Sequence, residues 1–247
     1  MLILNLRGGL GNQIIQIARA EAIDKNFKIN TAVTPLNPLL DKYQSKVVNS
    51  KLIERVGIVL RFIKSKLKGM RSDYCSFGIM DGYFQAGLDS SDFNDELLRT
   101  LAGKLKSESV SDLVIHFRGG DYLDDVNKKI FGYMGGDYYQ AALAKLAEEI
   151  DISTLKISVI TNDVAEAKAL FLDTLGLTFE ISSSSEIEDF SAILNSKYAI
   201  VPNSTFSLMA RILAVYANID CKTVYPLQWF TAQSKMLGPL IKEFERV

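Results

Sequence analysis

The sequence predicts an α/β protein made of two Rossmann-like domains that face a cleft. Along its 247 residues, short apolar runs alternate with stretches of helical periodicity, which is typical of parallel sheets covered by helices. Several of these runs end in turns rich in glycine, asparagine or hydroxyl side chains, and open α/β sheets bind ligands at such strand ends. A polar stretch at 104–112 lacks apolar periodicity, so we expect domains of residues 1–106 and 107–247.

The first half opens with a strand, a glycine turn and a helix that has Ile14, Ile17, Ala18 and Ala22 on one face. The glycine spacing is G-G-x-G and differs from the dinucleotide fingerprint G-x-G-x-x-G. The elements expected here are, in order, a strand at 2–6, the turn at 8–13 with its helix, a strand at 27–33, an irregular stretch at 34–50, a helix at 51–71, a short strand at 79–85 and a helix at 89–105.

The helix expected at 51–71 is both basic and amphipathic. Glu54 is its single acid, against seven cations: Lys51, Arg55, Arg61, Lys64, Lys66, Lys68 and Arg71. One interpretation is that the helix lies on an anionic membrane surface and makes peripheral contact there. The other is that its aliphatic face packs on the N-terminal sheet, while the cations stay in solvent. The pattern alone leaves both open.

The second half alternates strands and helices more regularly. Gly176 is expected to close one of its helices as a C-cap. The expected elements are, in order, a strand at 112–117, helices and strands in turn at 137–149, 155–161, 165–175, 177–181, 187–195 and 198–201, a helix from 202–205 to about 216, a strand at 223–225 and a helical tail after Pro226.

The strand expected at 112–117 leads into the stretch around which the chain is organised. It ends in His116, Arg118, Gly119, Gly120 and Asp121. An arginine on a glycine turn suits an anionic ligand, because its planar fork grips phosphate oxygens in pairs. His116 is the single histidine of the chain, so any mechanism that needs a histidine uses it. The simpler interpretation is an Arg118–Asp121 ion pair beside a histidine satisfied in the core.

Three further turns sit where a strand leads into a helix. Backbone amides and hydroxyls at 202–207 could form an anion cradle, and the turns at 8–13 and 161–163 lie in similar positions. The simpler interpretation of each is helix capping, by Asn12, by Asp163 and by the Ser/Thr pair at 204–205. An arginine turn and a hydroxyl cradle in one domain together suit a nucleotide diphosphate.

Composition excludes several other classes of protein. A net charge of −1 gives no case for nucleic acid as a partner, and two distant cysteines point to a reducing compartment. We expect a cytoplasmic protein, because no stretch has the roughly 20 apolar residues that cross a bilayer. The chain has no Asp-x-Asp, no P-loop and too few histidines for a His-rich zinc site. A diphosphate leaving group would then need protein cations and helix dipoles in place of a metal.

The motifs together resemble the bacterial α-1,2-fucosyltransferases, glycosyltransferase family eleven. The resemblance spans nearly the whole chain in the right order, through Gly-Gly-Leu-Gly-Asn-Gln at 8–13, Gly-Tyr-Phe-Gln at 82–85, His-x-Arg-x-Gly-Asp-Tyr at 116–122, a polar strand end at 161–163 and Asn-Ser-Thr-Phe-Ser at 203–207. It implies a GT-B fold, GDP-fucose as donor, a glycan or lipid-linked glycan acceptor, inversion at the sugar carbon, no metal or other cofactor, and a role in surface polysaccharide synthesis.

The resemblance also assigns roles to residues. Arg118 should bind the diphosphate and stabilise the leaving group, and Asp163 should lie near the nucleoside. His116 and Asp121 are candidates for the catalytic base by position. The other expected donor-binding residues are Gly11, Asn12 near the sugar, Asn203, and Ser204, Thr205 and Phe206 at the phosphates.

Three departures from the family pattern stand out. Gly119 replaces the second arginine of the motif, Leu208–Met209 replaces a tryptophan pair, and Ile14–Ile15 replaces Met-Phe. Two alternatives therefore keep the fold. One is a transferase with a different nucleotide-sugar donor. The other is a nucleotide-sugar-binding protein without activity, because Gly119 has removed a needed cation.

Overall fold

The computed structural model describes residues 1–68, 73–85, 95–120, 128–129, 131–182, 184–231 and 244–247, and it contains two sheets. The N-terminal sheet has five strands in the order β3-β2-β1-β5-β4. Its pairings are parallel except β4 with β5, which is antiparallel. The strands are β1 (Ile3–Asn5), β2 (Lys28–Asn30), β3 (Val47–Val48), β4 (Tyr74–Ser76) and β5 (Ile79–Asp81).

The C-terminal sheet has six strands in the order β11-β10-β9-β6-β7-β8, and every pairing in it is parallel. Its strands are β6 (Leu113–Phe117), β7 (Ile157–Thr161), β8 (Glu180–Ser182), β9 (Tyr198–Ile200), β10 (Lys222–Tyr225) and β11 (Glu245–Arg246). Two parallel-dominated sheets with helices confirm the predicted α/β class and agree with a GT-B-like arrangement.

The helices follow the expected order, with some differences. They are α1 (Leu10–Ile23), α2 (Lys51–Lys68), α3 (Asp95–Leu105), α5 (Gly136–Ala147), α6 (Val164–Lys168), α7 (Glu186–Asn195) and α8 (Thr205–Tyr216). The stretch expected to be irregular holds a 3₁₀ helix at Pro38–Lys46 as well as β3. The helix expected at 165–175 is α6 continued by a π-helical segment, Ala169–Thr174, and Gly176 beyond it has the left-handed φ of +64° expected of a C-cap.

Other expectations were wrong. Ala22, in the last turn of α1, is exposed. Gly9, and not Asn12, is the N-cap of α1. The described part of the tail after Pro226 is not helical, because its last residues form β11 and extend the sheet beside β10.

Each sheet has a point where its strand order reverses. In the N-terminal sheet the chain moves outward from β1 to β2 and β3, then returns to place β5 on the other side of β1. In the C-terminal sheet it moves from β6 through β7 to β8, then returns to place β9 on the other side of β6. Ligands of doubly wound sheets bind outside the carboxyl ends of the strands at such points. A ligand site is therefore expected at the carboxyl ends of β1 and β5 in one sheet and of β6 and β9 in the other.

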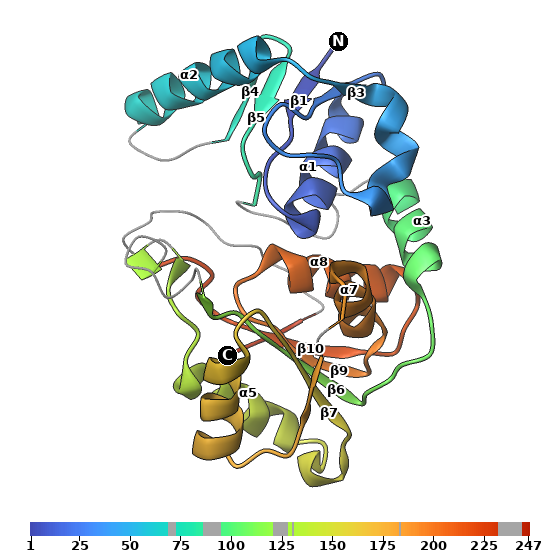
Figure 1. Cartoon of the computed structure of the whole chain (residues 1–247), viewed down its shortest axis with the longest axis vertical. Coiled ribbons are helices and arrows are strands. Elements are labelled where there is room, and N and C mark those ends of the chain that lie inside the picture. The colour runs from blue at the N-terminus through green and yellow to red at the C-terminus, as the bar shows by residue number, and fades with distance from the viewer. Residues whose placement is uncertain (69–72, 86–94, 121–127, 130, 183, 232–243) are drawn as a thin grey trace.

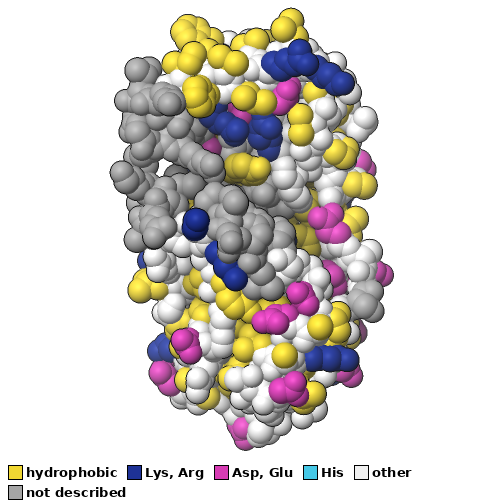
Figure 2. Space-filling view, turned by 60° about the vertical axis from the view of Figure 1, so that its left-hand side comes forward, with side chains coloured by type: hydrophobic (Ala, Val, Ile, Leu, Met, Phe, Trp, Pro, Cys, Tyr) yellow, Lys and Arg dark blue, Asp and Glu magenta, His cyan; other side chains and the backbone are white. Residues whose placement is uncertain are grey.

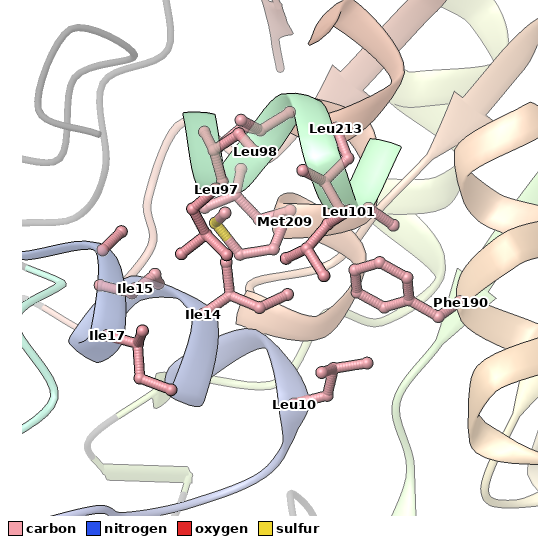
Figure 3. Packing of buried hydrophobic residues seen from close by; sticks show 14 of the residues in the cluster. Leu10, Ile14, Ile15, Ile17, Leu97, Leu98, Leu101, Phe190, Met209 and Leu213 are labelled. Atoms are coloured by element: carbon pink, nitrogen blue, oxygen red, sulfur yellow. The ribbon is translucent and has the colours of Figure 1, made fainter. Parts of the chain in front are cut away.

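The two halves share one apolar core. Figure 1 shows the sheets as upper and lower parts of the molecule, with α1, α3, α7 and α8 between them. In Figure 3, Ile14 of α1, Leu101 of α3, Phe190 of α7 and Met209 of α8 point toward one another, and all four are buried. Burial of these apolar side chains in one cluster fixes the two sheets against each other.

The sequence left two interpretations of helix α2 open, and the structure contradicts one of them. Its aliphatic face does not pack on the N-terminal sheet, because Leu52, Val59, Phe62 and Ile63 are exposed. The side turned to the sheet carries Gly57 and polar groups instead. Among the helices of the described chain, none is both long and apolar enough to cross a membrane.

Candidate active site

The arginine turn lies at the carboxyl end of β6, the central strand beside the reversal point. Arg118 follows β6 directly and is half-buried. The next two backbone amides bond to the turn after β7. Gly119 N donates to Asn162 Oδ1 at 3.1 Å, and Gly120 N donates to Asp163 Oδ2 at 3.4 Å. Gly120 has a φ of +57°, which favours glycine. These two hydrogen bonds therefore hold the turn that carries Arg118 against the turn that follows β7.

The same geometry explains the glycine at position 119. A Cβ there would lie 2.7 Å from the Cβ of Asp163, closer than two such atoms approach in proteins. Asp163 cannot withdraw easily, because it is the N-cap of α6 and its Oδ1 accepts from Glu166 N at 3.1 Å. In this chain the turn is too tight for the second arginine of the resembled motif. The capping interpretation of Asp163 is confirmed, and its carboxylate already serves two backbone amides.

His116 is buried at the end of β6, with 5% of its surface exposed. Burial, and secondarily the charge of Arg118, lowers the pKa of His116 to about 3, so its imidazole is neutral at pH 7. Its ring packs on Phe206, the second residue of α8, with 5.8 Å between ring centres. Nδ1 has no hydrogen-bond partner among the described residues. The simpler interpretation of a satisfied core histidine is therefore wrong for this nitrogen.

Helix α8 begins at the carboxyl end of β9, on the other side of the reversal point. Ser204 is its N-cap residue, but the Ser204 side chain makes no capping hydrogen bond, so the simple Ser/Thr cap is not what the structure shows. No acidic side chain lies in the first turn, at Thr205 and Phe206. The amides of a 12-residue helix thus begin without a side-chain cap, which leaves them suited to an anion.

Asn203 has a structural role that the sequence did not indicate. It is buried, and its Nδ2 donates to the carbonyl oxygens of Phe131 at 2.6 Å and Trp229 at 3.1 Å. These bonds tie the start of α8 to two distant loops. Both amide hydrogens are thereby used to position the cradle.

Helix α1 brings a second helix N-terminus to the same place. Its N-cap, Gly9, also makes no side-chain capping bond, and its first turn holds no acid. Gly11 packs directly on the start of α8, since a Cβ on Gly11 would lie 2.2 Å from the carbonyl oxygen of Thr205. The positive ends of two helix dipoles therefore meet between the two sheets, where they favour negative charge.

Asn12 lies beside this contact and has an unexpected partner. Gln85, just past β5, donates from Nε2 to Asn12 Oδ1 at 2.6 Å. Gly8, with a φ of +75°, lets the turn close over Asn12, because a Cβ at Gly8 would lie 2.7 Å from Asn12 Nδ2. Sequence reasoning quoted Gln85 within a motif but assigned it no role. Its place at the end of the strand expected at 79–85 was the available signal.

The structure thus brings together most of the predicted site residues. His116 lies within β6 and Arg118 directly after it. Across the reversal point lie Ser204, Thr205 and Phe206 at the start of α8, and Phe206 packs on His116. Gly11 reaches the start of α8 from the N-terminal half. Asp163 joins them through Gly120. The predicted Asp121 falls outside the described residues.

A family model described as Glycosyl transferase family 11 matches residues 1–235, which is nearly the whole chain. The chain belongs to glycosyl transferase family 11. It is 24% identical to an alpha-1,2-colitosyltransferase of Escherichia coli over 93% of this chain and 92% of that protein. It is 22% identical to the O-antigen biosynthesis glycosyltransferase WbnK of Escherichia coli, over 93% of this chain and 95% of that protein. Family 11 membership confirms the resemblance and supports glycosyltransferase activity for the chain.

Proposed function

We propose that this family 11 glycosyltransferase moves fucose from GDP-fucose to a hydroxyl group of a glycan, with inversion at the sugar carbon and without a metal ion. The observation that carries the proposal is the meeting of the α1 and α8 N-termini at the carboxyl end of β6, where Phe206 of α8 packs on His116 and Arg118 follows the strand. Two uncapped helix ends and one guanidinium provide positive potential for a diphosphate at the point where both sheets reverse.

The reaction uses this potential in the transition state. The acceptor oxygen attacks the anomeric carbon while the bond from that carbon to the phosphate oxygen breaks, and the electron pair leaves with the diphosphate. Arg118 and the α8 amides at Thr205 and Phe206 bind the departing charge. Donors positioned where charge develops contribute most when they are held in place beforehand, and the Gly119 and Gly120 bonds hold Arg118 in that way.

The proton of the acceptor hydroxyl needs a base or water. His116 is a weak base, because its pKa is lowered to about 3 and its ring is buried under Phe206. We therefore assign His116 a hydrogen bond to the donor through its unpartnered nitrogen. We keep Asp121, three residues beyond Arg118, as the candidate base. In Asp121→Asn, loss of the pH dependence of turnover would support this role, and an unchanged pH profile would remove it.

The acceptor is a glycan, free or lipid-linked, used in surface polysaccharide synthesis. The name of WbnK as an O-antigen biosynthesis glycosyltransferase supports this class of acceptor. A lipid-linked acceptor would place the reaction in the cytoplasm at the inner face of the membrane. Asn12 lies in the N-terminal domain next to the helix contact, where it can bond to the transferred sugar, and we assign this domain to the acceptor side of the site.

A second candidate function is colitosyl transfer. The printed name of the alpha-1,2-colitosyltransferase favours it, because that protein matches over almost the full length of both chains. Both functions share the site described here and differ only in the sugar attached to the diphosphate. The hypothesis of a nucleotide-sugar-binding protein without activity is less favoured. Glycine at position 119 fits a tight turn, and this turn keeps Arg118 in place.

Two measurements test the proposed function. Calorimetric titration with GDP, UDP and ADP should show tightest binding of GDP, and the purified enzyme should release GDP from GDP-fucose when a galactoside acceptor is present. Binding of GDP without turnover of GDP-fucose or of the matching colitose donor would favour the inactive binder. Preference for UDP or ADP would contradict the guanine assignment.

A further inference from the structure

Helix α2 is attached to its sheet through polar groups. Asp81, fully buried at the end of β5, accepts from Arg7 Nη2 at 2.8 Å and pairs with Arg61 Nη1 of α2 at 3.1 Å. Gly57 seats the helix closely, since a Cβ there would lie 2.2 Å from Asn5 Nδ2. Glu54, the single acid in the helix, turns inward to Arg7 at 3.4 Å. The polar side of α2 therefore faces the protein.

The opposite side of α2 is apolar and open. Leu52, Val56, Val59 and Ile63 follow one another at helical spacing and form a stripe, with Leu52 73% and Val59 55% exposed. Phe62 stands beside them, 60% exposed. Figure 2, which brings this side forward, shows hydrophobic side chains gathered at the upper end of the molecule, with lysine and arginine close by. Contiguous apolar surface of this kind marks an interaction site.

Charge decides what this surface fits. Lys51 and Arg55 are exposed on the flank of the stripe, while the single acid, Glu54, is neutralised on the inner side. The outward side of the described helix thus carries only positive charge beside apolar side chains. A second copy of the chain, docked by two-fold symmetry, would set α2 against α2 and bring like charges together. An anionic bilayer offers apolar depth and negative headgroups together.

We propose that α2 is a membrane-contact surface, which lays the stripe of Leu52, Val56, Val59 and Ile63 into the interface of an anionic phospholipid bilayer while Lys51 and Arg55 meet its headgroups. The Asp81–Arg61 pair attaches this surface to the end of β5, two residues before the Tyr83–Gln85 segment that reaches Asn12. The bilayer would therefore hold the domain that carries Asn12. The inference rests on the proposed function only where it takes the acceptor to be a lipid-linked glycan. Binding to the bilayer is measured separately from sugar transfer.

The test is sedimentation of the full-length protein with vesicles. Vesicles of phosphatidylcholine with phosphatidylglycerol should carry the protein down at low salt and release it at high salt, whereas pure phosphatidylcholine should not. Each exposed cation near an anionic surface contributes about fivefold to binding. Lys51→Glu with Arg55→Glu should therefore weaken vesicle binding at least about 25-fold. The triple variant Leu52→Ser, Val59→Ser, Ile63→Ser should also stay in the supernatant.

Matched variants control for a general change of surface. Val110→Ser with Leu172→Ser removes exposed apolar groups elsewhere, and Lys168→Glu with Lys197→Glu reverses charges elsewhere. Both should sediment like wild type, and all variants should keep wild-type circular dichroism. Lys64 is not a useful target, because its Nζ donates to Asp73 O at 2.8 Å.

Wild-type protein that stays in the supernatant with anionic vesicles at low salt would overturn the proposal. So would sedimentation that the α2 variants do not alter, or a dimer in gel filtration that the triple serine variant dissolves. The α2 variants should transfer sugar to a soluble acceptor at the wild-type rate. Vesicle binding by a protein without transferase activity would contradict the proposed function and leave the membrane surface standing.

Discussion

The side-chain amide of Gln85 donates to Oδ1 of Asn12 at 2.6 Å and joins the end of β5 to the first turn of α1. This bond bridges the reversal point of the N-terminal sheet. It leaves the Asn12 NH₂ group pointing toward the Gly8 turn, because a Cβ at Gly8 would lie 2.7 Å from Asn12 Nδ2. Gln85 is thus a positioning residue that acts through Asn12.

A double-mutant cycle tests this role. Gln85→Ala should lower kcat/KM by about 2- to 12-fold, the equivalent of one net hydrogen bond. If Gln85 acts through Asn12, the double variant Gln85→Ala, Asn12→Ala should lose no more than Asn12→Ala alone. The measurement is kcat/KM of all four proteins, with the melting temperature as a check on folding. Additive losses in kcat/KM would show that Gln85 acts independently of Asn12.

Arg118→Ala should reduce turnover by two to three decades. The physical reason is loss of a charged donor to the departing diphosphate, which costs about 2.7–4 kcal/mol in comparable sites. Arg118→Lys should recover only part of the loss, because lysine keeps the charge but not the paired geometry. Steady-state turnover with saturating donor measures the effect, and circular dichroism confirms the fold. Near wild-type turnover of Arg118→Ala would remove Arg118 from the leaving-group site.

Gly11→Ala should destabilise the protein by about 1–3 kcal/mol, as overpacking does. The new Cβ would lie 2.2 Å from the carbonyl oxygen of Thr205, and backbone atoms of two packed helices cannot easily move apart. Gly103→Ala is the matched control, because Gly103 is also helical and a Cβ there meets nothing within 4 Å. That change should raise stability by about 0.5–1 kcal/mol. Equal unfolding free energies for the two variants would argue against the α1–α8 contact.

The stability of the protein should fall as pH drops below about 6.5. The folded state holds His116 neutral with a pKa of about 3, whereas the unfolded chain binds a proton near its ordinary pKa of 6.5. The stabilisation is therefore complete above pH 6.5 and is lost toward pH 3, by about 1.4 kcal/mol per pH unit. Urea unfolding at pH 6.5 and pH 5 should differ by about 1.5–2 kcal/mol more in wild type than in His116→Gln. An identical pH response of the two proteins would contradict the buried neutral histidine.

Local patterns were sufficient to predict the central strands of both sheets and the turns at their ends, but not the edge strands β3, β4 and β11. Apolar runs such as the one at 113–117 are long enough to be strands and end in turn residues, so the positions of Arg118 and the α8 cradle followed from the sequence. The pairing of these turns did not follow. Gly11 touches Thr205 across almost the whole chain, and no local pattern reports a contact at that separation.

The orientation of α2 shows a second limit. Helical periodicity tells which residues share a face, but it does not tell which face is turned inward. The inner face of α2 is polar because Asn30, Asn5 and Asp81 lie side by side on three neighbouring strands and form a hydrogen-bonded row beneath it. Each of these residues comes from a different part of the chain, so the row appears only when the sheet is assembled. The structural role of Asn203 could not be predicted for the same reason, since its partners Phe131 and Trp229 are distant in sequence.

Transfer of fucose from GDP-fucose to a galactoside in excess EDTA is the most direct test of the mechanism. Arg118 and the N-termini of α1 and α8 are proposed to bind the diphosphate without a metal, so the rate of glycoside formation should be the same with and without the chelator. The product should have the inverted anomeric configuration by NMR. Complete loss of transfer in EDTA, restored by Mn²⁺ or Mg²⁺, would contradict the mechanism.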